Sequence, residues 1–477
     1  MTRSTAALAL GLALVLFPAC AATGAASPSR AETLRRIGQS AVDDDGLVGL
    51  SIAVSLDGRT IFAEGFGHAD LERTKPASAR TVYDIASVGK QFTSAAVMRL
   101  VDEGKLALDD RLYDLVPQTP PHFPNATIEQ LLHHTSGFVS GHLDELDPPE
   151  GLDRPRQGLE VLDDVELKEG RIVFQPSETF VYCNSGYLML GLVVEAAAGR
   201  PYAEFITREL LEPAGLTEIT VCQRPDSPLM ADSLHRSEQG LARVPFIHMS
   251  TYAGQGSVCA SVADLLAWEL ALEEGRILSR ESFQLFRTPA RVQGSFASAE
   301  LPYGMAQRLG TLAGTPKVGH TGTFDGGSAC LAHYPEAGLT VAVLTNTRGH
   351  GTPHARSIEA RVAAAVLAVD PFGELLLPTP LSPEQRQQIE GHYSNGAAFE
   401  ARVEGEDTLV VIREGEEIAR VVHTGGLVFR NPKLPTARER FLLDGETAGW
   451  WTYAVDGFLM EVNRRVEPDA ALPDTPR

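Results

Sequence analysis

The chain has 477 residues, of which 43% are hydrophobic and 22% charged, and its formal net charge is −21. This length predicts two or three domains with ample chain to bury a core, and the composition is that of a globular protein. So large a negative charge argues against nucleic acid or an anionic membrane surface as a partner. A soluble, acidic protein is expected.

The first 26 residues are predicted to be a signal peptide. A short positive stretch precedes an apolar run from Ala6 to Phe17 that is too short to span a bilayer. The run leads into Cys20 as in a bacterial lipoprotein signal, although Phe17 stands where a small aliphatic residue is usual. Cleavage near Ala22 to Ala26 is the alternative. Both predict export: to the periplasm, with a membrane anchor on a lipidated Cys20, or as a secreted protein.

A helix and a hairpin are predicted next. Ser29 to Asp45 has the pattern of a helix that is polar on one side. Val48 to Leu56 and Thr60 to Gly67 are apolar runs joined by Asp57-Gly58, a dipeptide typical of hairpin turns. These two strands are candidates to complete a sheet formed by strands from the far end of the sequence.

The stretch from Tyr83 to Thr93 carries the first chemical motif. Ser87 and Lys90 stand three residues apart at the start of an apolar helix that ends at Gly104, so they share one helix face. A serine becomes nucleophilic when a base takes its proton, and a lysine is such a base only where burial or a second cation favours the neutral amine. A serine at a helix start beside a surface lysine is the alternative.

Adjacent histidines end a short helix that begins at its N-cap Thr127. His133 and His134 cannot face each other on a helix, and no carboxylate follows at ligand spacing. A structural turn is therefore expected here, and no metal or other cofactor is predicted.

An acidic excursion follows from Ser140 to Arg171. It is rich in Asp, Glu and Pro, and its weak periodicity predicts a surface segment able to act as a lid. The acidic excess between Asp144 and Asp153 favours either a cationic substrate or merely a solvated loop.

The second motif is Tyr182-Cys183-Asn184, which precedes a predicted helix from Ser185 to Ala198 with Gly199 as its stop. Helices are also predicted over Tyr202 to Leu211 and from Ser261 to Glu274.

The third motif, His320-Thr321-Gly322, closes a predicted strand. Ser328 to Tyr334 and Leu339 to Thr345 are two further strands with a short link, which predicts antiparallel pairing. A helix from Ser357 to Val369 ends this region, so residues 30–370 are expected to form the main domain.

Residues 371–383 contain several prolines and are predicted to be a linker. The sequence pattern after this linker differs from that of the main domain. Over residues 384–470, short strand-like runs alternate with Gly and charged turns, which predicts a small all-β barrel.

Cysteines beyond the N-terminal segment show no metal-ligand spacing. In an oxidising compartment a disulfide remains open, with three ways of pairing four thiols. The residues concerned are Cys183, Cys222, Cys259 and Cys330.

The three motifs, in this order, resemble those of the serine β-lactamase and penicillin-binding-protein-like superfamily. The likeness spans residues 33–368 and is greatest to the class C β-lactamase-related branch of esterases, D-aminopeptidases and D-alanyl-D-alanine carboxypeptidases. It implies a mixed α/β (α+β) fold: an antiparallel sheet flanked by helices, an all-helical subdomain, and the site between them. The C-terminal strands resemble the lipocalin-like barrel appended to many such hydrolases.

The resemblance assigns catalytic roles. Ser87 would form an acyl-enzyme, Lys90 would help take its proton, and Tyr182 would pass the proton to the leaving group and later activate water. Which of Lys90 and Tyr182 is the acylation base stays open. Asn184 would hold Lys90 and the substrate.

The resemblance also implies binding roles at the strand motif. The backbone N–H groups of Ser87 and Thr323 would form the oxyanion hole, and Gly322 would let substrate lie close to the strand edge. His320 stands where β-lactamases and carboxypeptidases usually have Lys, so a permanent cation for a substrate carboxylate is missing. Cys183, where Ser is common, is expected to be a packed small residue.

The predicted function is that of a serine hydrolase, esterase-like or D-aminopeptidase-like, acting on small esters, amides or peptides. The alternatives are a β-lactamase or D-alanyl-D-alanine carboxypeptidase, and a sensor or pseudoenzyme that binds cell-wall peptides without turnover.

Overall fold

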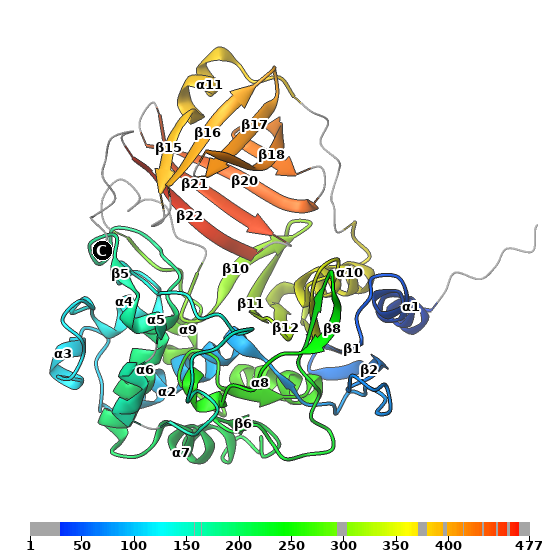
Figure 1. Cartoon of the computed structure of the whole chain (residues 1–477), viewed down its shortest axis with the longest axis vertical. Coiled ribbons are helices and arrows are strands. Elements are labelled where there is room, and N and C mark those ends of the chain that lie inside the picture. The colour runs from blue at the N-terminus through cyan, green and yellow to red at the C-terminus, as the bar shows by residue number, and fades with distance from the viewer. Residues whose placement is uncertain are drawn as a thin grey trace, which may run out of the picture.

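The computed structural model of the chain describes residues 29–156, 158–163, 165–292, 303–370, 379–394, 398–413, 415–431, 434–444, 447–455 and 458–466 (Figure 1). The predicted signal peptide with Cys20 lies outside the described residues. So does most of the predicted linker, and the domain boundaries stay a prediction. Among the described helices, none is long and apolar enough to cross a membrane.

An antiparallel sheet forms the centre of the main domain, with strand order β10-β11-β12-β13-β1-β2. β1 pairs with β13 from Leu50↔Thr345 to Leu56↔Leu339, so the N-terminal hairpin completes the sheet as expected. The strands are β1 (Gly49–Leu56), β2 (Arg59–Gly67), β10 (Arg308–Leu312), β11 (Thr315–Phe324), β12 (Gly327–Tyr334) and β13 (Leu339–Thr345).

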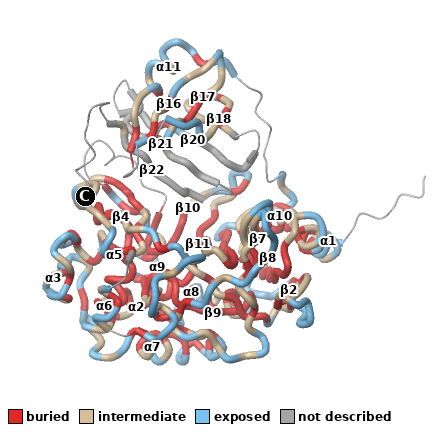
Figure 2. The backbone as a smooth tube through the Cα atoms, viewed as in Figure 1, coloured by how far each residue is buried: buried red, intermediate tan, exposed pale blue. Residues whose placement is uncertain are grey.

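Helices cover both faces of this sheet, and alternation along β1 decides which side chains meet them. Ile52 and Val54 belong to the core shared with α1 (Arg30–Asp43) and α10 (Ala355–Leu367). Ala53 points to the opposite core, which α8 (Val262–Glu273) shares with the helical subdomain. The red segments of Figure 2 follow these two cores.

The helical subdomain packs on α8 through large apolar side chains. Phe92 of α2 stacks on Trp268 of α8 with ring centroids 3.9 Å apart, and the Trp268 indole donates to Gln91 Oε1 (3.1 Å). This pair holds the start of α2 against the sheet side of the domain. The helices of the subdomain are α2 (Lys90–Asp102), α3 (Leu112–Leu115), α4 (Ile128–Leu132), α5 (Val165–Lys168), α6 (Asn184–Ala198), α7 (Tyr202–Phe205) and α9 (Arg280–Phe286).

Short strands tie the loops together around the helices. One three-stranded sheet has the order β3-β9-β6 and another β14-β7-β8, while β4 pairs with β5. Their bounds are β3 (Tyr83–Asp84), β4 (Phe138–Val139), β5 (Arg171–Ile172), β6 (Thr220–Val221), β7 (Leu234–Ser237), β8 (Gly240–Arg243), β9 (Val258–Ala260) and β14 (Thr347–Gly349).

The C-terminal strands form a curled sheet in which β15 also pairs with β22, so the ring closes as a barrel (Figure 1). The described part of its core includes Tyr393, Phe429, Phe441 and Trp451. The sequence pattern misses β15, a short strand with polar residues. The elements are α11 (Pro383–Ile389), β15 (Gly391–Ser394), β16 (Ala398–Glu404), β17 (Thr408–Arg413), β18 (Glu416–Gly425), β19 (Val428–Asn431), β20 (Leu434–Asp444), β21 (Thr447–Val455) and β22 (Phe458–Val466).

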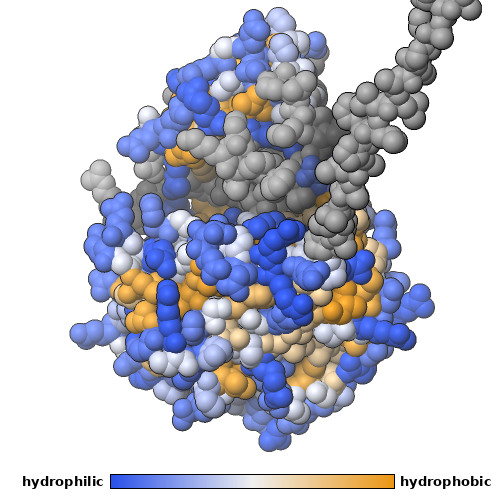
Figure 3. All heavy atoms as spheres, turned by 90° about the vertical axis from the view of Figure 1, so that its right-hand side faces the viewer, coloured by the Kyte–Doolittle hydropathy of each residue, from blue (hydrophilic) through white to orange (hydrophobic). Residues whose placement is uncertain are grey.

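The barrel joins the main sheet along one edge, because β22 pairs with β10 at Phe458↔Gly310. The face shown in Figure 3 is mostly hydrophilic where residues are described, with hydrophobic side chains in separate groups. The disulfide that the sequence left open is not formed among the described residues, since Cys183, Cys222, Cys259 and Cys330 are free thiols.

A buried ion pair ties α10 to β11. Lys317 Nζ lies 3.0 Å from Glu359 Oε2, both side chains are fully buried, and the Tyr334 hydroxyl donates to Glu359 Oε1 (2.5 Å). Breaking a buried pair on one side leaves a buried charge without its partner. Glu359→Gln is therefore expected to lower the free energy of unfolding by about 3–5 kcal/mol in denaturant titrations.

The exposed pair Arg35–Glu64 is the matched control. Exposed pairs contribute about 0–1 kcal/mol, so Glu64→Gln is expected to change stability by no more than that. Equal losses in the two variants would contradict the stabilising role of the buried pair.

Candidate active site

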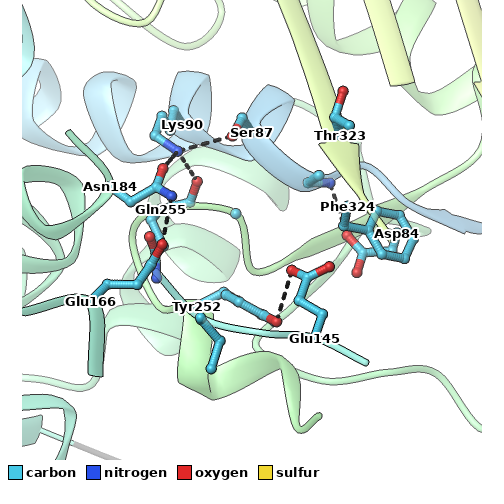
Figure 4. A pocket seen from close by; sticks show the side chains of 13 residues that line it. Asp84, Ser87, Lys90, Glu145, Glu166, Asn184, Tyr252, Gln255, Thr323 and Phe324 are labelled. Carbon is cyan, nitrogen blue, oxygen red and sulfur yellow. Dashed lines mark hydrogen bonds between the residues drawn. The ribbon is translucent and has the colours of Figure 1, made fainter. Parts of the chain in front are cut away.

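A pocket of about 500 Å³ lies where the start of α2, the end of β11 and two loops meet (Figure 4). Of the predicted site residues, it brings together Ser87, Lys90, Asn184 and Thr323. Tyr182, His320 and Gly322 do not line it. The remaining lining residues, which the sequence motifs do not include, are Asp84, Ala86, Leu143, Glu145, Glu166, Tyr252, Gln255, Gly256 and Phe324.

Ser87 lies in a 3₁₀ turn, Ala86–Gly89, that runs directly into α2. Ala86 has φ = 45°, a left-handed conformation uncommon for a residue with a side chain, and its N–H donates to Asp84 Oδ1 (2.8 Å). Gly89 fits against Gly256, because a Cβ on Gly89 would lie 3.2 Å from the Gly256 backbone. The strained turn holds the Ser87 hydroxyl at the pocket wall.

Lys90 is buried and connects three parts of the site. Its Nζ donates to Ser87 Oγ (3.1 Å), to Asn184 Oδ1 (2.9 Å) and to the backbone oxygen of Gln255 (2.6 Å). Three acceptors match the three donors of an ammonium group. The expected neighbourhood of Ser87 and Lys90 is therefore present in the fold.

Asn184 is the first residue of α6, and the preceding Cys183 caps this helix. The Asn184 side chain bridges Lys90 and the acidic segment, because its Nδ2 donates to Glu166 Oε1 (2.9 Å). Glu166 is a site residue that the motifs did not reveal. A bridge from lysine through amide to carboxylate fixes both side chains beside Ser87.

Tyr182 lies next to Lys90, whose Nζ is 5.1 Å from the ring centroid. The guanidinium of Arg308, on β10, lies 5.2 Å from the same ring. The buried Tyr182 hydroxyl has no hydrogen-bond partner among the described residues. Two cations near the phenol can stabilise negative charge that develops there during proton transfer.

His320 is fully buried behind Tyr182, with the two ring centroids 6.2 Å apart. Burial, with Arg308 and Lys90 nearby, holds the pKa of His320 well below its usual range. The neutral imidazole donates from Nδ1 to the Thr321 oxygen (2.7 Å), so Nε2 accepts from the Tyr303 hydroxyl (3.1 Å). His320 therefore offers no positive charge to a substrate.

His134 continues this buried chain of hydrogen bonds. Its Nε2 lies 3.1 Å from the Tyr303 hydroxyl, and its Nδ1 accepts the N–H of Cys183 (3.1 Å). Burial lowers the pKa of His134 well below normal, with a further contribution from Lys90. The adjacent-histidine turn thus supports the backbone next to Tyr182, and Tyr303 is a supporting residue that no motif indicated.

Gly322 allows a close approach of the backbone at Ile85, whereas the sequence predicted a close approach of substrate. A Cβ at Gly322 would lie 2.2 Å from the Ile85 oxygen, in the segment that leads to Ser87. The missing side chain lets β11 pack on the turn that contains Ser87. Thr323, one residue on, is exposed at the pocket beside Ser87.

The opposite wall of the pocket is acidic (Figure 4). Glu145 accepts hydrogen bonds from the Tyr252 hydroxyl (3.1 Å) and the Asp325 N–H (2.8 Å). Burial, assisted by the negative charges of Asp84 and Asp325, raises the pKa of Glu145 to about 7. Burial also raises the pKa of Asp84 to about 6, although the Ala86 N–H and Arg224 oppose it. The acidic excess of the excursion was the only sequence signal for this wall.

Cys183 is a packed residue in the structure. Burial raises the pKa of its thiol to about 11, so the reactive thiolate is disfavoured. Its Sγ instead accepts the N–H of Gly186 (3.2 Å) at the start of α6.

One group of described residues has potential metal ligands close together: Glu269, Glu273 and His333. Arg287 already donates to both carboxylates, with Nη1 at 2.6 Å from Glu273 Oε1. The Arg287 guanidinium already neutralises the carboxylates of Glu269 and Glu273 that would attract a metal ion. We therefore interpret this cluster as a structural ion-pair network.

Comparison with known proteins supports one family. The profile of the Beta-lactamase family matches residues 34–366. Penicillin-binding protein 4* of Bacillus subtilis is 25% identical over 312 residues, 61% of this chain and 66% of that protein. A D-aminopeptidase of Brucella anthropi is 26% identical over 306 residues, 63% of this chain and 56% of that protein. The chain thus spans less than two thirds of these relatives.

Solved structures share the fold. The octameric penicillin-binding protein homologue from Pyrococcus abyssi has a TM-score of 0.63 at 24% identity, over 90% of this chain and 98% of that one. A D-amino acid amidase from Ochrobactrum anthropi has a TM-score of 0.60 at 21% identity, over 70% of this chain and 99% of that one. The predicted α/β architecture is confirmed, and this chain belongs to the Beta-lactamase family of serine hydrolases.

Proposed function

We propose that this protein hydrolyses small amides and esters through an acyl-enzyme on Ser87, with amides of D-amino acids that carry a free amino group as the favoured class. The observation that carries the proposal is the contact of Lys90 Nζ with Ser87 Oγ (3.1 Å) at the wall of an acidic pocket. Relatives named D-aminopeptidase and a structural neighbour named D-amino acid amidase support the substrate class.

In the proposed acylation, the Ser87 oxygen attacks the carbonyl carbon while its proton passes to Lys90 or to Tyr182, whichever serves as the base. The backbone N–H groups of Ser87 and Thr323 stabilise the oxyanion; one such donor contributes about 3 kcal/mol. The C–N or C–O bond then breaks, and the proton goes to the departing amine or alcohol. Water, deprotonated by the same groups, releases the acid and restores Ser87.

The charge of the pocket supports a cationic substrate. Three carboxylates, Asp84, Glu145 and Glu166, line the pocket together with Ser87. A protonated α-amino group would be attracted to them, whereas the carboxylate of a β-lactam would be repelled. His320, neutral and buried, supplies no compensating cation. These charges speak against the β-lactamase and carboxypeptidase alternatives.

A substrate panel tests the proposal on the purified chain: D- and L-aminoacyl p-nitroanilides, chromogenic esters and nitrocefin. The expected order places D-alanyl or D-leucyl p-nitroanilide first and nitrocefin last. Enzyme-like nitrocefin turnover would overturn the substrate assignment. A permanent Ser87 adduct without product release would favour the sensor alternative.

Glu145→Gln is expected to lower kcat/KM for a D-aminoacyl p-nitroanilide by about 10–100-fold, because a hydrogen bond to a charged group contributes about 1.5–3 kcal/mol. Hydrolysis of neutral p-nitrophenyl acetate is expected to stay within about threefold. Glu150→Gln, at an exposed position of the same segment, is the control. Equal losses on both substrates would show that Glu145 does not recognise the amino group.

The same idea predicts a pH dependence. With a pKa of about 7, Glu145 becomes neutral as the pH falls below that value and no longer attracts an ammonium group. The ratio of kcat/KM for the D-aminoacyl p-nitroanilide to that for p-nitrophenyl acetate should therefore fall between pH 7.5 and 5.5. In Glu145→Gln it should fall less, because only Asp84, with a pKa of about 6, then titrates in this window. The ratio cancels the titration of groups that serve both substrates, and the Glu145→Gln profile corrects for the α-amino group of the substrate, which p-nitrophenyl acetate lacks.

A further inference from the structure

A second pocket, of about 640 Å³ including its open mouth, lies further along α6 from Asn184 and beside the residue that follows Tyr252. It shares no lining residue with the pocket at Ser87. Leu188, Leu192 and Val161 form an apolar wall.

A buried guanidinium lines this pocket, and no ion pair within 4 Å joins it to a described residue. Arg156 lines the pocket and is 6% exposed, and its Nη1 has no hydrogen-bond partner among the described residues. Its Nη2 donates to the Glu160 backbone oxygen, and its backbone N–H donates to Ser250 Oγ (2.8 Å). Lys168, and more weakly Arg156, lower the pKa of Asp163, but no described carboxylate contacts Arg156 Nη1. A buried donor without an acceptor is costly, and a guanidinium suits a carboxylate.

Glu195 supplies the opposite charge in the same pocket. Its Oε1 accepts the Tyr202 N–H (2.9 Å), and burial raises its pKa. Its Oε2 faces the loop that contains Arg156, since a Cβ on Gly158 would lie 3.7 Å from it. Arg156 Nη1 has no hydrogen-bond partner among the described residues, Glu195 included, so the pocket presents one cation and one anion beside an apolar wall.

We propose that this pocket is a second, non-catalytic binding site for the zwitterion of a small apolar amino acid. Arg156 binds the carboxylate, Glu195 accepts from the ammonium group, and the side chain packs on Leu188 and Leu192. A ligand with only one of the two charges leaves either Arg156 or Glu195 without a partner. The site therefore prefers the free amino acid to its carboxylate-only or amine-only analogues.

The site is joined to the active site by shared elements. α6 begins with Asn184 at the first pocket and carries Leu188 and Glu195 at the second. The loop alternates in the same way, with Tyr252 at the first pocket and Ala253 at the second. Tight contacts join the two elements, because a Cβ on Gly254 would lie 2.2 Å from the Tyr187 oxygen. Occupancy of the second pocket is therefore expected to alter turnover.

The expected effect on turnover rests on the proposed function, because the product of that reaction is a free amino acid. The binding of an amino acid to the second pocket does not depend on the proposed function. Calorimetry on the full chain carrying Ser87→Ala, which cannot turn over, measures binding of D-leucine, 4-methylpentanoate and 3-methylbutylamine. D-Leucine is expected to bind at least about tenfold more tightly than either analogue. Arg156→Gln and Glu195→Gln should each weaken D-leucine by at least about tenfold.

Two controls separate this site from the alternatives. Arg154→Gln removes an exposed guanidinium two residues away and should bind D-leucine like the parent. Ala203→Leu fills the pocket from α7 and should abolish binding without lowering the melting temperature. This second variant keeps the test valid even if Arg156→Gln fails to fold. Binding that survives both Arg156→Gln and Ala203→Leu but is lost in Glu145→Gln would place the ligand at Ser87 and overturn the proposal.

The coupling between the second pocket and the active site is measured by the hydrolysis of p-nitrophenyl acetate in the presence and absence of D-leucine. D-Leucine should change kcat in the wild-type chain and leave it unchanged in Arg156→Gln. Binding without any change in kcat would overturn the coupling and keep the site. Absence of D-aminoacyl p-nitroanilide hydrolysis would remove the proposed function and leave the calorimetric result intact.

Discussion

Ser87→Ala is expected to lower kcat for every substrate by about 10⁴-fold or more, as removal of the nucleophile does in other serine hydrolases. The Ser87 hydroxyl interacts with Lys90 only through one hydrogen bond, and Lys90 keeps Asn184 and Gln255 as acceptors. The variant should therefore fold normally and still bind substrate. Steady-state assays with p-nitrophenyl acetate measure the loss.

Ser94→Ala is the control, since Ser94 is a buried serine of α2, the helix that follows the Ser87 turn, and its hydroxyl contacts Tyr187. Its activity should stay within about threefold of the wild type. Mass spectrometry after rapid quenching should find the acyl group on the peptide that contains Ser87. Wild-type turnover in Ser87→Ala, or acylation elsewhere, would refute the assignment.

Tyr182→Phe is expected to lower kcat by about 10²–10⁴-fold, the usual contribution of a positioned acid–base group. The change removes only the hydroxyl, which has no hydrogen-bond partner among the described residues, so little stability should be lost. The pH profile is the sharper measurement. A limb of the kcat profile present in the wild type should be missing from Tyr182→Phe if the phenol moves the proton.

Tyr113→Phe removes a tyrosine hydroxyl that donates to the Phe123 oxygen away from the pocket, and it should leave kcat unchanged. Rate loss in Tyr182→Phe with an unaltered pH profile would indicate a positioning role, with Lys90 alone as the acylation base. A loss below threefold would remove Tyr182 from the mechanism.

The turn and cap patterns in the sequence correctly predicted the elements whose ends depend on neighbouring residues. Asp57-Gly58 forms the hairpin turn between β1 and β2, Thr127 and Ser261 cap their helices, and Gly199 ends α6 at φ = 65°. Each depends on neighbours within four residues, so a pattern in the chain is sufficient.

Other local predictions were less accurate for physical reasons. The strand predicted to close at Gly322 continues to Phe324, because β12 pairs with it through Phe324↔Gly327. Ser87 was expected in the helix with Lys90, but a 3₁₀ turn precedes α2 there. Both depend on packing between segments far apart in the sequence.

The candidate nucleophile, the lysine beside it and the order of motifs that indicates the family could be predicted from the chain alone, because they are spacings of a few residues and identities that chemistry requires. Their surroundings could not, because they depend on how distant segments pack. Glu145 and Glu166 reach the pocket from the acidic excursion, Arg308 approaches Tyr182 from β10, and the Gln255 backbone oxygen meets Lys90 across 165 residues. No local pattern encodes such meetings, since the packing of distant elements creates both the contacts and the burial that shifts the pKa of Glu145.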